Sequence, residues 1–138
     1  MLIAPDGRAV HIDFGFILGR DPRPWAPPVR LPRELVDALG GPGSDAHRRC
    51  DALACEAYSV LRRAAPRLAA CLHLAARCAA PDVRRAPASA ALFVLDRLRT
   101  GAGDAAAGDA FAAALRDGAA ALAPALFERT HQWAQAWR

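Results

Sequence analysis

The residues with the clearest potential for chemistry lie near the N-terminus, in the stretch His11-Ile12-Asp13-Phe14-Gly15. Asp13 follows apolar residues typical of a strand, and Gly15 lets the backbone turn away after it. A carboxylate placed in this way at the edge of a cleft can bind a magnesium ion. Three such residues also recur by chance, and the alternative is that Asp13 only caps a turn. On these residues alone, Asp13 is a candidate metal ligand.

Three arginines form a second group, in the proline-rich stretch that follows. Residues 16–31 contain Arg20, Arg23 and Arg30 against one acidic residue, Asp21, so the net charge is three minus one, or +2. Cations of this kind attract phosphates and other anions. The alternative is that each arginine is solvated surface charge.

Aromatic and basic residues form a third group at the C-terminus. Trp133 and Trp137 are four residues apart, so on a helix they share one face, close to Arg129 and Arg138. Such a helix end suits contact with a membrane surface. Packing of both indoles on the domain is the alternative, and we expect one to be buried and the other to be available to lipid.

The composition limits the classes of protein to which the chain can belong. Its 138 residues are 54% hydrophobic and 23% charged, so a folded domain is expected rather than a disordered chain. All 18 basic residues are arginine, and neither lysine nor asparagine occurs. The net charge of +4 favours anionic partners such as phosphates, lipid headgroups or nucleic acid, without choosing among them.

The elements that must position these groups can be predicted along the chain. Residues 2–4 and 9–12 read as two strands joined by a turn that contains Gly7. The prolines between residues 22 and 32 predict a long loop. Helical patterns follow over residues 33–39, which end at Gly40, and over residues 45–63, which Ser44 can cap. Further helices are predicted over residues 66–80 and 89–99. Residues 101–108 are predicted to be a linker, and a final helical stretch runs from Asp109 with a bend at Pro124.

The predicted inward faces follow from helical spacing. The apolar residues that we expect to face the core are Leu53, Ala57, Val60 and Leu61 on the second helix and Leu68, Cys71, Leu72 and Ala75 on the third.

The four cysteines are expected to be reduced and buried, because they lie in predicted helices without a C-x-x-C pair. They are Cys50, Cys55, Cys71 and Cys78. Residues 1–10 lack the continuous apolar region of a signal peptide, and no apolar run reaches the roughly 20 residues that a bilayer requires.

Longer strings resemble a known family. The stretch H-I-D-F-G-F-I-L-G-R-D-P, residues 11–22, resembles the metal-binding segment of the phosphatidylinositol 3- and 4-kinases. The next nine residues look like the activation loop of the class III phosphatidylinositol 3-kinases, and residues 131–138, H-Q-W-A-Q-A-W-R, are similar to that class's closing helix. Leu61-Arg62-Arg63, Pro81-Asp82 and Asp96-Arg97 also fall where the family has like residues. The G-R-D-P-x-P and H-x-W-A-Q-x-W strings within these stretches argue against the 4-kinases.

This resemblance implies a fold and a set of roles. The fold class is mainly α (α+β): a short N-terminal hairpin ending in D-F-G over residues 1–15, an activation loop over 16–32, and five to six helices over 33–138. This would be the C-terminal lobe portion of a protein-kinase-like lipid kinase, ending in an amphipathic helix. Asp13 would bind the metal, with Phe14 and Gly15 setting its orientation. Arg20, Arg23 and Arg30 would read the lipid, and Trp133, Trp137 and Arg138 would contact the membrane.

The resemblance also implies cofactors and partners. The complete enzyme would use ATP with Mg²⁺ or Mn²⁺ and phosphorylate the 3-hydroxyl of phosphatidylinositol. A lightly basic loop fits the unmodified lipid better than one already carrying several phosphates. The expected protein partners are a regulatory protein-kinase-like scaffold subunit and a Beclin-type subunit, with no nucleic acid. The expected location is cytoplasmic, on endosomal or autophagic membranes, in endocytosis and autophagy.

One departure from the family lowers the activity expected of these 138 residues alone. Phosphoryl transfer also needs a phosphate-binding lysine, a catalytic-loop base and a second metal ligand, usually asparagine. The chain has no lysine or asparagine, and we expect the N-lobe and catalytic loop to lie upstream. Two alternatives remain open: an inactive kinase-derived module that binds membranes or a helical partner, and a basic nucleic-acid-binding domain supported by charge only.

Overall fold

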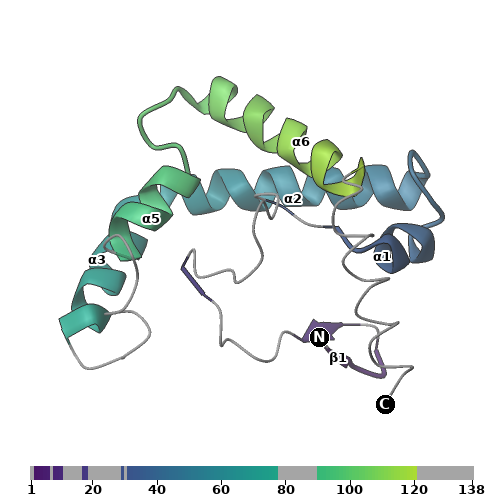
Figure 1. Ribbon diagram of the computed structural model, residues 1–138, viewed down its shortest axis with the longest axis horizontal. Coiled ribbons are helices and arrows are strands. Elements are labelled where there is room, and N and C mark those ends of the chain that lie inside the picture. Colours follow the sequence, from purple (N-terminus) through teal and green to yellow (C-terminus); the bar gives the residue numbers. More distant parts are fainter. Residues whose placement is uncertain are drawn as a thin grey trace, which may run out of the picture. The chain divides into compact units, whose positions relative to one another are not determined.

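The computed structural model describes residues 2–6, 8–10, 17–18, 29, 31–77 and 90–120 of the chain. Within these residues it contains two short strands and five helices (Figure 1). They are β1 (Leu2–Ile3), β2 (Ala9–Val10), α1 (Arg33–Ala38), α2 (Asp45–Arg63), α3 (Ala65–Arg77), α5 (Ala90–Arg97) and α6 (Asp104–Ala120). The prediction of a mainly helical chain is confirmed.

The chain divides into two compact units. The first comprises Met1–Pro24 and Ala65–Arg97, and the second comprises Trp25–Ala64 and Leu98–Arg138. The first therefore holds the strands with α3 and α5, and the second holds α1, α2 and α6.

The two strands of the first unit are very short. They pair antiparallel, with Leu2 opposite Val10 and Ile3 opposite Ala9. The Ala4 amide donates to the Arg8 carbonyl at 2.8 Å, and Asp6 accepts from the Arg8 amide and side chain. Strands in stable sheets usually have about five or six residues. A pairing of two residues per strand does not by itself make the stable hairpin that the sequence predicts, which stays a prediction.

Helices α3 and α5 pack against each other in the first unit. Ala65 and Ala90, at the starts of the two helices, are almost fully buried. Leu68, Leu72 and Ala75 are half-buried, but Cys71 is exposed, so its predicted inward position is wrong. A helix that packs against one short neighbour buries only part of its surface, and Cys71 lies outside that part.

Helix α2 begins and ends where the sequence predicts, because its boundary signals are local. The Ser44 side chain accepts a hydrogen bond from the His47 amide at 3.1 Å, which satisfies one free donor of the first turn. Before it, Gly40, Gly41 and Gly43 all have positive φ, which glycine adopts without strain. These glycines form the turn that separates α1 from α2.

The predicted inward face of α2 is wrong. Tyr58 is the buried residue of this helix, at 6% exposure, whereas Leu53, Val60 and Leu61 are 56%, 49% and 46% exposed. The Tyr58 ring stacks on Phe111 of α6, with ring centroids 4.2 Å apart and the planes nearly parallel. An aromatic ring buries more apolar area than the aliphatic side chains of the other face. The face of α2 that packs against α6 is therefore the one that contains Tyr58.

Helix α6 runs antiparallel to α2, since residue 62 lies beside residue 104 and residue 58 beside residue 111 (Figure 1). Its buried side follows helical spacing through Ala107, which is fully buried, Leu115 and Gly118. The small side chain of Ala107 allows close approach of the two helices.

The predicted linker over residues 101–108 is wrong in its second half, because α6 already begins at Asp104. An acidic residue in the first turn and the three alanines after it favour helix. Together they outweigh the cost of Gly108, which is about 1 kcal/mol relative to alanine inside a helix.

Arg62 joins the end of α2 to the turn before α6. Its side chain is only 9% exposed and donates to the carbonyls of Leu98, Arg99 and Ala102 and to the carboxylate of Asp104. The bonds to Arg99 and Ala102 measure 2.6 and 2.9 Å, and that to Asp104 measures 2.9 Å. A guanidinium that has lost most of its contact with water requires such partners, because an unpaired one would lose hydration without compensation.

The conformation of Arg99 makes this turn unusual. Its φ is 48°, in the left-handed region that glycine normally supplies just after a helix ends. The Arg99 carbonyl accepts from the Arg62 side chain and from the Ala102 amide, which is 2.9 Å away. Two hydrogen bonds thus hold a backbone that a residue with a side chain rarely adopts.

Replacement of Tyr58 should separate the observed inward face from the predicted one. We expect Tyr58→Ala to lower the free energy of unfolding by about 3 kcal/mol or more, since the variant loses a buried ring and its stacking contact with Phe111. Leu53→Ala on the same helix should change it by less than about 0.5 kcal/mol, because Leu53 is exposed. Urea unfolding followed by circular dichroism measures both, and a larger cost for Leu53→Ala would contradict the packing described.

Replacement of Arg62 should destabilise the second unit more than replacement of its neighbour. Arg62→Met keeps much of the side-chain length but removes the hydrogen bonds that the guanidinium donates to the carbonyls of Leu98, Arg99 and Ala102. We therefore expect a clear fall in the thermal melting midpoint. Arg63→Met serves as the matched control because Arg63 is exposed and has none of these contacts. Equal midpoints for the two variants would show that the Arg62 contacts contribute no stability.

Candidate functional site

The residues predicted to carry chemistry lie outside the described residues. This holds for Asp13, Phe14 and Gly15, for the three loop arginines and for the C-terminal residues Trp133, Trp137 and Arg138. Their predicted roles therefore stay predictions.

The structure describes residues 8–10 before the D-F-G stretch and residues 17–18 after it, all in the first unit. Strand β2 ends at Val10, three residues before Asp13, and Ile17 and Leu18 are half-buried. Leu18 has φ 55°, in the left-handed region, which costs a residue other than glycine about 1 kcal/mol or more. Strained backbone of this kind tends to occur at functional sites. The sequence gives no signal for it at Leu18, because leucine is not a residue that favours this conformation.

The best-defined polar cluster of the second unit is the Arg62–Asp104 pair. The hydrogen bond to Asp104 raises the pKa of Arg62, and a bond to Tyr58 acts in the same direction. Its donors are engaged by three backbone carbonyls and one carboxylate. We interpret the cluster as structural, because a guanidinium committed to its own backbone has little capacity left for a phosphate.

No sequence pattern would have identified this pair. The two residues are 42 positions apart, and the resemblance of Leu61-Arg62-Arg63 to the family does not point to a contact with Asp104. Arg62 lies in the last turn of α2, where a positive charge interacts favourably with the helix dipole. That position does not predict a contact with Asp104.

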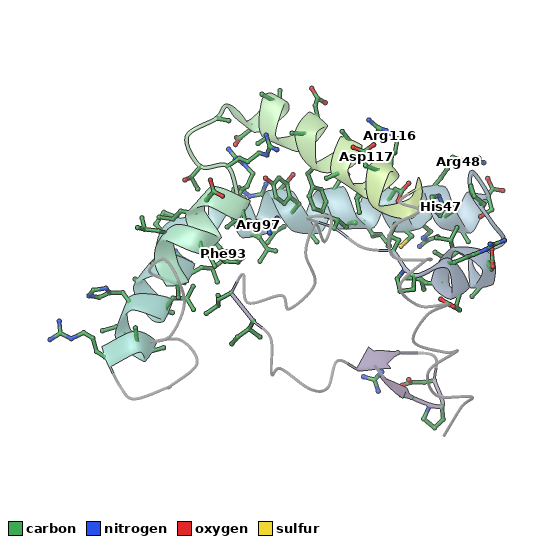
Figure 2. All side chains as sticks on the ribbon, viewed as in Figure 1. His47, Arg48, Phe93, Arg97, Arg116 and Asp117 are labelled. Atoms are coloured by element: carbon green, nitrogen blue, oxygen red, sulfur yellow. The ribbon has the colours of Figure 1, made fainter. Side chains whose placement is uncertain are left out.

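Figure 2 labels two further side-chain groups within the units. On α5, the Arg97 guanidinium lies over the Phe93 ring at 5.3 Å from its centroid, one helical turn away. On α2, His47 Nδ1 is 3.6 Å from Asp51 Oδ2, and its buried Nε2 has no hydrogen-bond partner among the residues that the structure describes. Both contacts are between residues of one helix and give no arrangement that would act on a substrate.

Within residues 31–77 and 90–120 and the shorter described stretches, no group of three or more His, Cys, Asp or Glu side chains could hold a metal ion. Cys50 and Cys55 are half-buried and Cys71 is exposed, all as free thiols, and Cys78 lies outside the described residues. The predicted burial of the cysteines is thus wrong for Cys71.

None of the described helices combines the length and the apolar composition needed to cross a bilayer.

Comparison with known proteins gives one consistent family. The sequence profile described as phosphatidylinositol 3- and 4-kinase matches residues 1–85, which include Asp13, Phe14 and Gly15. The phosphatidylinositol 3-kinase VPS34 of Arabidopsis thaliana is 38% identical over the whole chain, and that of Saccharomyces cerevisiae is 35% identical over the whole chain. The phosphatidylinositol 3-kinase catalytic subunit type 3 of Caenorhabditis elegans is 36% identical over 107 residues.

These relatives are much longer than the chain. It covers 17% of the Arabidopsis protein, 16% of the yeast protein and 12% of the nematode protein. Since the profile matches more than half of the chain and two of these relatives match all of it, the chain belongs to the phosphatidylinositol 3- and 4-kinase family and corresponds to a C-terminal part of the catalytic domain of its class III 3-kinases.

Proposed function

We propose that the chain forms the end of the catalytic lobe of a phosphatidylinositol 3-kinase, which moves the ATP γ-phosphate to the 3-hydroxyl of phosphatidylinositol. The observation that carries this proposal is the similarity over all 138 residues to proteins named phosphatidylinositol 3-kinase. The D-F-G stretch lies inside the part that also matches the family profile.

Asp13 is the residue that we assign to the metal. A carboxylate oxygen is the hard ligand that Mg²⁺ or Mn²⁺ prefers, and Phe14 and Gly15 would set its direction. When bound with ATP, the metal neutralises charge on the phosphates. One carboxylate does not make a complete site. Because the chain has no asparagine or lysine, the second ligand and the phosphate-binding cation must come from elsewhere in the enzyme.

We assign lipid recognition to the loop over residues 19–32, through Arg20, Arg23 and Arg30. The net charge of +2 over residues 16–31 is small for binding a headgroup with several phosphates. It fits phosphatidylinositol, whose headgroup has a single phosphodiester.

The proposed partners and location rest on the resemblance to class III enzymes. They are a protein-kinase-like scaffold subunit and a Beclin-type subunit, on endosomal or autophagic membranes. The alternative function is an inactive kinase-derived module that binds membranes or a helical protein. The complete absence of lysine and asparagine favours that alternative if the chain acts alone.

The isolated chain should have no measurable lipid kinase activity. Asp13 alone can hold a metal but cannot position ATP or activate the lipid hydroxyl. Radiolabelled ATP and phosphatidylinositol vesicles provide the assay, with the full-length Arabidopsis relative as positive control. Turnover by the purified 138 residues that is lost in Asp13→Ala would contradict this expectation.

The proposed function can be tested in a chimera, in which the chain replaces the matching stretch of the Arabidopsis relative. We expect this chimera to phosphorylate phosphatidylinositol, and Asp13→Asn to reduce kcat by about 100-fold or more, because a metal-ligand charge is lost.

Asp6→Asn is the matched control for that substitution. It makes the same chemical change at an exposed residue seven positions earlier, where the carboxylate only pairs with Arg8. Equal melting midpoints would show that both variants fold. Retention of most of the rate in Asp13→Asn would mean that Asp13 is only a turn residue.

The C-terminal tryptophans can be assigned by comparing membrane binding with stability. If Trp133 and Trp137 contact lipid, changing both to Ala should weaken sedimentation with anionic liposomes while the melting midpoint is retained. Arginines near an anionic surface contribute about 1 kcal/mol each, so binding should also fall with added salt. A large fall in the melting midpoint would instead place the indoles in the core, since loss of a buried Trp costs about 3–5 kcal/mol.

A further inference from the structure

We draw no further inference here: the strongest candidate, the exposed apolar face of α2 formed by Leu53, Val60 and Leu61, carries none, because nothing in the part of the chain that the structure describes shows what covers it.

Discussion

The hydrogen bonds of the Arg62 guanidinium are the interaction on which the second unit depends. A guanidinium with only 9% exposure needs its hydrogen-bond partners, and apart from Tyr58 on the same helix these lie between residues 98 and 104. The turn is therefore held against the end of α2, and α6 must start from it. From that start, two helical turns along α6 bring Phe111 opposite Tyr58. One polar contact thus sets the register in which the aromatic pair of the two helices can form.

Local signals were enough to predict most helix boundaries. Ser44 caps α2, glycines with positive φ end α1, and both ends of α2 lie where the pattern placed them. The inward face of α2 could not be predicted in the same way, because helical spacing groups Leu53, Val60 and Leu61 without showing that Tyr58 is the residue that packs. Its orientation depends on contacts with residues more than 40 positions away, which periodicity does not report. The start of α6 was missed because Gly108 resembles a linker residue, although its alanine-rich neighbours continue the helix.

The candidate site was predicted from strings rather than from periodicity, and it lies at the two ends of the chain. The D-F-G stretch and the C-terminal tryptophans both lie outside the described residues, so the structure does not test their roles. What it adds near Asp13 is the left-handed backbone at Leu18, five residues later.

The residue types in the chain show why membership of a kinase family does not by itself predict activity of these 138 residues. Phosphoryl transfer requires cations on the phosphates and two metal ligands, so that negative charge is neutralised as the bond to the leaving group breaks. Here every cationic side chain except histidine is an arginine, and one of them, Arg62, is committed to backbone carbonyls. The only residue with a proposed metal role is Asp13. Within the part of the chain that the structure describes, the helices provide structural contacts such as those of Arg62, and they contain none of the residues to which we assign a role in the reaction.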